Sequence, residues 1–513
     1  MRLFQTIAGL RCYLSDQRQD QTIGLVPTMG ALHAGHLSLI QRATDENDLV
    51  VVSIFVNPLQ FGPTEDFDCY PRSLETDCGL CEQMGVDAVF APSAKEMGMS
   101  PLSKSPKTTL VVPPQSMMSV LCGGSRLGHF EGVATVVTKL FNVVQPDQAY
   151  FGQKDAQQLA IIRRLVADLQ IPVKIRACAI AREGSGLALS SRNQYLTPQQ
   201  KEQASVLFRS LQKASEAFAA GQSDSSVLKE IVTQELASVP DVNLEYAELV
   251  NPDTLTPIDS VQEEGLLAIA AKVGATRLID NVILHRRQPI VAIDGPAGAG
   301  KSTVTRRVAE ALDLLYLDTG AMYRALTWLV MQSGIDFEER AAIAELASQA
   351  DIQLVPAKSA DALVRVYING EDVTERIRTQ AVTNNVSAIA AQPAVRDELV
   401  KQQQRWGKKG GIVAEGRDIG THVFPDAELK IFLTASVQER ARRRLQDLQE
   451  QGESDVSLEQ LEKDIETRDY KDSHREVAPL QKAADAIEVN TDGLTIEEVT
   501  DKIISLYSQR TQS

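Results

Sequence analysis

The sequence predicts an α/β protein with two parallel-sheet units. A short apolar strand, a Gly-rich or polar turn and a helix follow one another twice, starting at 23–26 and at 290–293. Alternating strands and helices are typical of parallel sheets with crossover helices. The 513 residues suffice for about three or four domains. Because 43% of them are hydrophobic, each domain can bury a core.

The first unit is expected to combine a parallel sheet with a smaller α+β domain. Thr197-Pro198 joins a capping residue to a proline at the first helical position, which predicts a long helix from there to about Ala220. We expect domains at 1–181 and 182–285, followed by a polar connector at 285–289. Strands are predicted at 23–26, 50–56, 88–90, 148–151, 173–180, 244–250, 266–271 and 276–284, with a helix at 156–169.

The second unit, 286–513, is expected to carry an insertion in its sheet. Residues 363–368 followed by Asn369-Gly370 predict a hairpin with a type I′ turn. Strands at 411–414 and 429–433 then return to the main sheet. Two charged helices are predicted, at 436–451 and 458–472.

Composition narrows the classes of partner. Lys and Arg number 52 and Asp and Glu 68, a net charge of −16. Such an acidic chain is a poor ligand for long nucleic acids or anionic membranes, although a local basic pocket can still bind a small phosphorylated ligand. No apolar run approaches the roughly 20 residues of a membrane span, and the N-terminus lacks a cleavage site. We expect a cytoplasmic protein without nucleic-acid or membrane partners.

The six cysteines do not predict a disulfide framework, because none follows Cys178. Cys78-Gly-Leu-Cys81 is a single CxxC. A zinc site would need a second pair or nearby histidines, and a redox motif would need a strand-to-helix turn, whereas 74–84 predicts a helix. We expect ordinary reduced thiols.

The first chemical motif lies in the turn after strand 23–26. Ligands bind beyond the carboxyl ends of parallel strands, and a helix that starts at about His36 would direct free N–H groups at an anion. Gly30 and Gly35 allow close backbone approach. His33 and His36 are three residues apart and can face one phosphate. Capping or surface histidines, or a metal pair lacking a third ligand, are the alternatives.

His33-Ala34-Gly35-His36 resembles the HxGH signature of the nucleotidyltransferase superfamily, which includes class I aminoacyl-tRNA synthetases. The wider resemblance is to the pantothenate synthetase (pantoate–β-alanine ligase) family. It covers about residues 1–284 and implies a Rossmann-like nucleotidyltransferase domain. Gln153 departs from the pattern, where Glu is equally expected. The matching segments are PTMGALHAGH at 27–36, SIFVNPLQFGPTEDFDCYPR at 53–72, GHFEGVATVVTKLFN at 128–142, FGQKDAQQL at 151–159 and LALSSRN at 187–193.

This resemblance implies that ATP, pantoate and β-alanine give pantothenate, AMP and diphosphate through a pantoyl adenylate. The attacking carboxylate is already ionised at pH 7 and needs no general base, so the site must stabilise charge on the phosphates. The resemblance also implies a homodimer through this half. It assigns catalysis to His33, His36 and Lys154, pantoate or β-alanine binding to Gln60 and Gln158, and ATP binding also to Met29, Gly30, Gly152, Asp155, Ala181, Leu189, Ser190, Ser191 and Arg192.

The second motif is GxxxxGK[ST], placed between strand 290–293 and a helix to about Ala311. In this setting loop N–H groups wrap a β-phosphate, Lys301 reaches the β- and γ-phosphates and the Ser302 hydroxyl can bind Mg²⁺. The motif does not distinguish a kinase from a GTPase, but no Asn-Lys-x-Asp guanine signature follows it. The predicted loop residues are Gly295, Gly298, Gly300, Lys301, Ser302 and Thr303.

Many arginines follow this loop. One set lies in segments that can converge on the open edge of the sheet: Arg378, Arg396, Arg417, Arg468 and Arg475. A second set, within 440–444, indicates a lid over ATP phosphates or a solvated helix face: Arg440, Arg442, Arg443 and Arg444.

From 292 to about 506 the chain resembles the bacterial cytidylate kinase family, through IDGPAGAGKST, LDTGAMYRAL, EDVTERIRTQ, EGRDIGTHVFPDAELKIFL and RDYKDSHREVAPL. The resemblance implies a P-loop nucleoside monophosphate kinase fold with inserted NMP-binding and lid segments, which phosphorylates CMP or dCMP from ATP. Thr319 stands where Ser is common, and Lys471 where Arg also occurs. The resemblance assigns Arg443 to ATP and implies a CMP site in which the phosphate, the ribose and the cytosine have separate contacts. These are Arg324, Arg417 and Arg475 for the phosphate, Asp472 for the ribose, Ser387, Arg396 and Asp418 for the cytosine, with Thr319 and Arg468 also at the CMP site.

The sequence thus predicts a bifunctional enzyme that uses ATP as co-substrate with Mg²⁺. One alternative, a degenerate non-catalytic half, conflicts with the presence of His33, His36, Lys154, Lys301 and Ser302. An RNA-binding synthetase relative conflicts with the net acidity and with the lack of a basic extension. Another nucleoside monophosphate kinase is the alternative for the second half.

Overall fold

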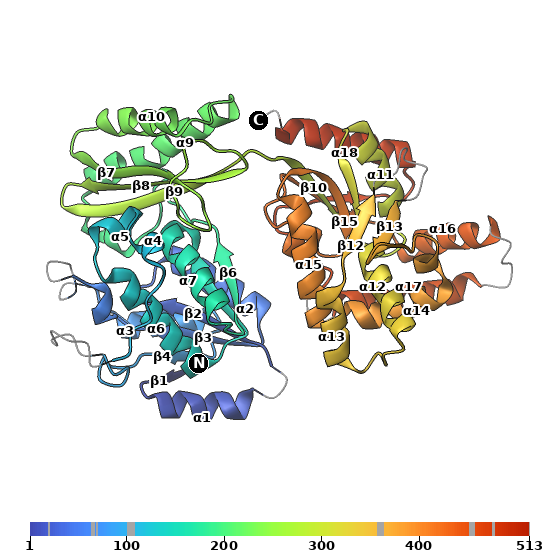
Figure 1. Ribbon diagram of the computed structural model, residues 1–513, viewed down its shortest axis with the longest axis horizontal. Coiled ribbons are helices and arrows are strands. Elements are labelled where there is room, and N and C mark those ends of the chain that lie inside the picture. Colours follow the sequence, from blue (N-terminus) through green and yellow to red (C-terminus); the bar gives the residue numbers. More distant parts are fainter. Residues whose placement is uncertain are drawn as a thin grey trace. The chain divides into compact units, whose positions relative to one another are not determined.

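The computed structural model describes residues 1–18, 21–62, 67, 70–99, 108–355, 364–450, 457–474 and 478–511. The chain divides into two compact units, Met1–Arg286 and Arg287–Ser513 (Figure 1). Both contain a parallel sheet with helices on its two faces, which confirms the expected α/β class.

The first unit contains a six-stranded sheet in the order β1-β4-β3-β2-β5-β6. Every neighbouring pair is parallel. From β2 the chain first adds β3 on one side and later β5 on the other, so the crevice for a ligand lies at the ends of β2 and β5. The strands are β1 (Arg2–Phe4), β2 (Ile23–Thr28), β3 (Leu49–Ile54), β4 (Ala88–Phe90), β5 (Gln148–Gly152) and β6 (Lys174–Cys178).

Helices cover both faces of this sheet. On one face α1 (Ile7–Gln17), α6 (His129–Val144) and α7 (Ala156–Asp168) bury a core that includes Leu10, Phe130 and Ile161. On the other face α2 (Ala34–Glu46) and α3 (Leu74–Gln83) bury Ile40 and Cys81. Short helices lie near the strand ends: η1 (Pro58–Gln60), α4 (Gln115–Met118), α5 (Leu121–Ser125) and η2 (Gln153–Asp155).

Residues 182–286 of this unit form a three-stranded antiparallel sheet with helices on one face. Figure 1 shows α9 and α10 lying across the strands that they contact. The predicted helix starts at Pro198 behind a complete Thr197–Gln200 capping box. The elements are η3 (Ser191–Tyr195), α8 (Pro198–Ala204), α9 (Val206–Ala219), α10 (Ser225–Ala237), β7 (Val242–Val250), β8 (Glu264–Val273) and β9 (Thr276–His285).

The prediction of one continuous helix to Ala220 was wrong. The helix is interrupted at Ser205, whose backbone N–H and hydroxyl both donate to the carbonyl of Glu202, at 3.2 and 2.6 Å. The break is confined to this one residue, which keeps φ −61° and ψ −20° and whose carbonyl accepts the N–H of Arg209 at 3.2 Å. Residues 182–286 bury their own core around Leu207 and Ile269, but also add Val250 and Leu266 to the core of the larger sheet. The domain boundary at 181/182 therefore stays a prediction.

The second unit contains a five-stranded parallel sheet in the order β11-β15-β10-β16-β17. Helices α11 and α18 pack on one face around Val308 and Ile503, and α15 packs on the other face. These elements are β10 (Gln288–Asp294), α11 (Lys301–Ala311), β11 (Leu315–Asp318), α15 (Pro393–Gly407), β15 (Gly410–Gly416), η5 (Ile419–Val423), β16 (Leu429–Thr434), β17 (Ile487–Asn490) and α18 (Ile496–Thr511).

The predicted insertion is a small antiparallel sheet packed on helices of its own. Asn369 and Gly370 have φ values of 51° and 83°, as both central residues of a type I′ turn require, so this hairpin is confirmed from Arg365 onward; Leu363 lies outside the described residues. The elements are α12 (Thr319–Ser333), α13 (Arg340–Gln349), β12 (Ile352–Val355), β13 (Arg365–Ile368), β14 (Glu371–Asp372), η4 (Arg376–Arg378) and α14 (Gln380–Ala390).

The two predicted charged helices are α16 (Val437–Glu450) and α17 (Leu458–Ser473), which pack through Ala441, Leu448 and Leu461. Gln451, the predicted end of the first, lies outside the described residues. Within the described ranges, no helix has both the length and the apolar character needed to span a bilayer.

The expected connector at 285–289 is shorter than predicted. His285 is the last residue of β9 and pairs with Glu264, whereas Gln288 starts β10 and pairs with Gly410. Only Arg286 and Arg287 lie between the two strands. Polar composition suggested a loop, but backbone pairing extends both strands into it.

We expect separate chains of residues 1–286 and 287–513 each to unfold in one cooperative transition. Starting the second chain at Ile290 should lower its free energy of unfolding by about 1–3 kcal/mol, because it removes the partner of Gly410 and the Arg287 guanidinium that pairs with Asp426 and Glu428. Urea unfolding followed by circular dichroism measures this. A chain starting at Arg286 is the control and should match 287–513; equal stability of the Ile290 version would contradict the prediction.

Candidate active sites

The first unit has a cavity of about 770 Å³ at the carboxyl ends of β2 and β5. Of the predicted ligase residues, Gly30 alone does not line this cavity. It forms the turn after β2, where its φ is 82° and a Cβ would lie 3.0 Å from the side chains of Asp77 and Ile54. The structure brings together the other predicted residues: Met29, His33, His36, Gln60, Gly152, Lys154, Asp155, Gln158, Ala181, Leu189, Ser190, Ser191 and Arg192.

The two histidines sit at the start of α2, which begins at Ala34, slightly earlier than predicted. His33 caps the helix, and its Nδ1 accepts the N–H of Gly35 at 3.1 Å. In a neutral imidazole the other nitrogen then carries the proton, so His33 Nε2 is a donor. The rings of His33 and His36 have centroids 4.0 Å apart.

Both histidines are neutral donors at pH 7. Burial, with a smaller effect of the Lys154 ammonium, lowers the pKa of His33 to about 4. Burial, His33 and Lys154 lower the pKa of His36 to about 3. Neutral imidazoles can stack closely and still donate N–H groups to a phosphate without mutual repulsion.

Asp77, which the sequence reasoning missed, holds this turn from behind. Its side chain on α3 is buried, and its two oxygens accept the N–H groups of Ala31 and Leu32, both at 2.9 Å. Ser73 donates to the same carboxylate at 3.2 Å. No local pattern marks this role, because it depends on the packing of α3 beside β2.

Lys154 follows β5 on η2 and is half-buried. Burial lowers its pKa to about 8, against the attraction of Asp280 and Asp155. Lys154 therefore remains largely protonated at pH 7. Asp155 caps α7 by accepting the N–H of Gln158 at 3.2 Å, which fixes the turn between the lysine and the predicted substrate amide.

Gln60 ends η1, and α6 holds its backbone. The carbonyl of Gln60 accepts from His129 Nδ1 at 2.7 Å and from Arg126 at 3.2 Å. A Cβ at Gly132 of α6 would lie 2.4 Å from the carbonyl oxygen of Leu59, so this close approach requires glycine. Arg126 also lines the cavity and was missed from sequence.

In the second unit the predicted phosphate loop joins β10 to α11. Gly295 has a φ of 151°, and a Cβ there would lie 2.1 Å from the carbonyl oxygen of Leu433. Lys301 donates to the carbonyl of Pro296 at 2.8 Å. Burial and Arg417 lower the pKa of Lys301, against the attraction of Glu415.

Glu415, at the end of the neighbouring strand β15, was not predicted. Its buried carboxylate accepts the Ser302 hydroxyl at 2.9 Å and the Tyr316 hydroxyl. Its carbonyl accepts from Thr319 at 2.7 Å. Thr303 is exposed on the first turn of α11.

Several of the predicted arginines converge, each beside a carboxylate. Arg324 pairs with Asp318 at 3.2 Å and Arg417 with Asp472 at 2.9 Å. The pKa of Arg378 is lowered by burial and then by the positive charge of Arg324. The pKa of Arg468 is lowered in the same way by burial and by Arg417. These arginines repel one another through their positive charges. A phosphate dianion bound among them would relieve that repulsion. Arg475 lies outside the described residues, and Lys471 lies on α17.

Arg396 and Asp418, both buried, form an ion pair. Arg396 also donates to the carbonyl of Ala390 at 3.2 Å, and its guanidinium lies 5.4 Å from the centre of the Tyr323 ring. Ser387, their predicted companion, lies one turn before Ala390 on α14 with an exposed side chain.

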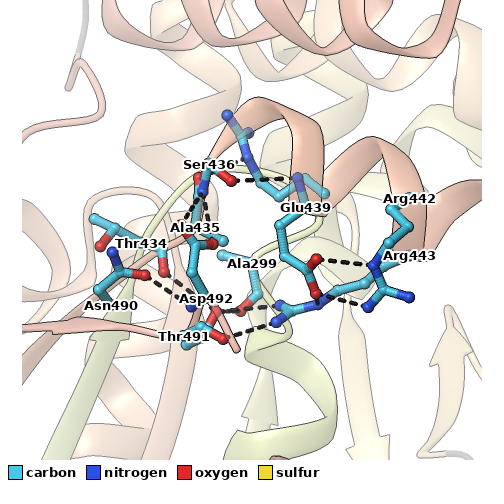
Figure 2. Close-up of polar contacts among 11 residues, drawn as sticks. Ala299, Thr434, Ala435, Ser436, Glu439, Arg442, Arg443, Asn490, Thr491 and Asp492 are labelled. Atoms are coloured by element: carbon cyan, nitrogen blue, oxygen red, sulfur yellow. Dashed lines mark hydrogen bonds and ion pairs between the residues drawn. The ribbon is translucent and has the colours of Figure 1, made fainter. Parts of the chain in front are cut away.

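Figure 2 shows how Arg443 of α16 is held over the phosphate loop. Its guanidinium donates to Glu439 at 2.8 Å and to the hydroxyl and carbonyl of Thr491 at 3.1 and 2.8 Å. Its Nη1 lies 3.8 Å from the place that a Cβ of Gly300 would occupy. Asp492 accepts the N–H of Ser436 at 2.9 Å, so the turn after β17 also fixes the start of α16.

The other three arginines of α16 separate into two groups. Arg440 pairs with Asp469 of α17 at 3.0 Å and donates to the carbonyl of Ala297 at 3.1 Å, beside Gly298 of the loop. Arg442 and Arg444 are exposed. The predicted cluster therefore places Arg440 and Arg443 beside the loop, whereas Arg442 and Arg444 lie on a solvated face.

Comparisons with known proteins agree with these two sites. The pantoate-beta-alanine ligase family model matches residues 2–283, and the cytidylate kinase model matches residues 291–509. A bifunctional pantoate ligase/cytidylate kinase of Nostoc sp. is 64% identical, with 99% of both chains covered. Its counterpart from Synechocystis sp. is 59% identical, also with 99% of both chains covered.

Among solved structures, a pantothenate synthetase from Thermus thermophilus is 43% identical with a TM-score of 0.52. The match covers 55% of this chain and 99% of that one. Together, the two family models and the full-length relatives show that the chain belongs to the family of bifunctional pantoate ligase/cytidylate kinases.

Proposed function

We propose that each unit catalyses one ATP-dependent reaction. The first joins pantoate to β-alanine through a pantoyl adenylate and releases AMP and diphosphate. The second transfers a phosphoryl group from ATP to CMP or dCMP and gives ADP with CDP or dCDP. The observation that carries the proposal is that donors from separate strand ends meet: His33 and His36 after β2 with Lys154 after β5, and Lys301 after β10 with Arg417 after β15.

In the ligase unit a pantoate carboxylate oxygen attacks the α-phosphorus of ATP, and the bond to diphosphate breaks. The carboxylate is ionised at pH 7, so the site has only to stabilise negative charge in the transition state. His33 Nε2 and His36 are neutral donors and Lys154 is a cation, and all three line the cavity. Gln60 and Gln158 can donate to the pantoate carboxylate and accept from its hydroxyls.

The second ligase step breaks the acyl–phosphate bond. The neutral amine of β-alanine attacks the acyl carbon, AMP leaves with the bonding electron pair, and the proton lost from the amine nitrogen passes to the solvent. The donors that stabilise phosphate charge in the first step also make AMP a better leaving group. Ser190, Ser191 and Arg192 line the same cavity, where they can also bind the phosphates.

In the kinase unit an oxygen of the CMP phosphate attacks the γ-phosphorus of ATP. Catalysis is mainly positioning and charge stabilisation, supplied by Lys301 and by the cluster around Arg324 and Arg417. The Ser302 hydroxyl beside the Glu415 carboxylate provides the oxygen ligands that Mg²⁺ prefers, so these residues fit an ion that enters with ATP. Mg²⁺ would neutralise charge on the β- and γ-phosphates.

Base selection is assigned to the Arg396–Asp418 pair. The Asp418 carboxylate can accept from the 4-amino group of cytosine, whereas uracil presents a carbonyl there. Ser387 and Asp472 stay predicted contacts of the base and ribose. We place the protein in the cytoplasm, where its substrates occur, and the homodimer through the first unit stays a prediction that sedimentation of the 1–286 chain can test.

His36→Ala should lower the rate of pantoate-dependent exchange of diphosphate into ATP by about 10²–10³-fold. The KM for pantoate should change much less, because the imidazole acts on the phosphates. His285→Ala is the matched control, since His285 is exposed at the end of β9. Unchanged exchange in His36→Ala would remove His36 from the mechanism.

Replacing Asp418 should relax the preference for CMP over UMP. Alanine would remove both the counter-charge and the acceptor of the buried Arg396, at a cost of about 3–5 kcal/mol. Asp418→Asn also removes the charge, but its amide oxygen can still accept from Arg396 and its amide nitrogen can donate to the uracil 4-carbonyl. We expect the ratio of kcat/KM values for CMP and UMP to fall at least about tenfold. The ligase reaction of the same polypeptide is the control, and an unaltered ratio would show that Asp418 does not read the base.

A further inference from the structure

Strand β9 contacts both segments that carry the phosphate donors of the ligase site. It packs against η2, which contains Lys154, and against η3, which follows Ser190. Asp280 and Asn281 are adjacent on this strand, and their side chains are 2% and 5% exposed. Neither side chain is among those that line the cavity.

Asn281 holds the backbone on both sides of the Lys154 side chain. Its Nδ2 donates to the carbonyl of Gln153 at 3.0 Å and to the carbonyl of Lys154 at 2.9 Å. A side-chain amide nitrogen has two N–H groups, and both are used here on consecutive carbonyls. The turn from β5 into α7 is thereby tied to a strand more than a hundred residues later in the chain.

Asp280 holds the second segment through Arg182. The two nitrogens Nη1 and Nη2 of Arg182 donate to the two carboxylate oxygens at 2.6 and 2.9 Å, and the N–H of Asn281 donates to the same carboxylate at 2.8 Å. Arg182 pairs with Ala188 as an isolated β-bridge and donates to the carbonyl of Gly186 at 3.1 Å. This small hairpin leads directly into Ser190.

The Asp280 charge also acts on Lys154. Burial lowers the pKa of Lys154, and Asp280 is the strongest of the influences that raise it. Without Asp280, the lysine would lose its proton at a lower pH. The charged and titratable groups that face Lys154 are Asp155 from its own turn, Asp280 from β9, Arg182 from the hairpin, Arg192 from η3, and His33 and His36 from the start of α2.

We propose that Asp280 and Asn281 are positioning residues of the ligase site: Asn281 places Lys154, and Asp280, through Arg182, places the segment Ser190–Arg192. The proposal rests on the proposed ligase function and extends it to residues that touch no substrate. Small displacements of donors are costly, because phosphate stabilisation depends on their geometry. Because Asp280 and Asn281 are adjacent on β9, one strand fixes the position of Lys154 relative to the segment Ser190–Arg192.

The test uses the full chain and pantoate-dependent exchange of diphosphate into ATP. Asn281→Leu retains the side-chain volume but removes both donors. We expect kcat to fall at least about tenfold, while the KM for pantoate changes less than about threefold because Gln60 and Gln158 are untouched. Unchanged kcat in a folded Asn281→Leu chain would overturn the role of Asn281.

Asp280→Asn is nearly isosteric and adds a readout that a purely structural role would not move. Loss of the Lys154 proton should reduce kcat/KM for ATP as the pH rises through the pKa of about 8. Removing the negative charge lowers that pKa, so the decline should begin at a pH lower by about half a unit or more. Loss of thermal stability with an unmoved decline would indicate a structural role only and would overturn the proposal.

The matched control is Asp253→Asn, an exposed aspartate between β7 and β8. It should retain both the exchange rate and the pH profile of the unaltered chain. If Asn281→Leu fails to fold, Asn281→Ser replaces it, because serine is smaller and also loses the two amide donors to the carbonyls of Gln153 and Lys154; unchanged kcat there would overturn the role of Asn281. If the unaltered chain shows no pantoate-dependent exchange, the proposed ligase function itself is wrong. If the unaltered chain is active and the variants behave like it, only the positioning role is contradicted.

Discussion

Both sites depend on holding a lysine ammonium partly out of water at the end of a parallel strand. Burial lowers the pKa of Lys154 and of Lys301, and each lysine keeps nearby carboxylates that favour its charged form. In the first unit these are Asp155 and Asp280, and in the second Glu415 and Asp294. A triphosphate replaces the hydration that each ammonium loses on burial, and its attraction to the lysine is stronger there than in water.

In the kinase unit the arginines proposed to bind the substrate are held in ion pairs. Arg417 pairs with Asp472, Arg324 with Asp318 and Arg396 with Asp418. In the proposed mechanism these arginines receive the phosphate and the base, so each pair has to loosen or widen when CMP binds. Breaking these ion pairs lowers the affinity for every ligand. Only a ligand that has both a phosphate and the matching base edge can supply new partners for the arginines, so this cost favours specificity.

The parts of the sites that could be predicted from sequence are those made by neighbouring residues. The turn before α2 and the loop before α11 form from contiguous segments, where glycine positions, a capping side chain and a free helix end act locally. Asp77, Glu415 and Asn281 could not be predicted, because each acts on a segment distant in sequence. The break at Ser205 escaped prediction for the opposite reason: it alters one turn without changing the apolar pattern.

The short connection between the two units agrees with the fact that the motifs of each half could be analysed separately. Only Arg286 and Arg287 separate β9 from β10, and each of these strands pairs within its own sheet. Each unit also has its own buried core. Because each sheet is paired and covered within its own unit, we expect each phosphate site to form without the other unit, which agrees with motifs that lie wholly within one half.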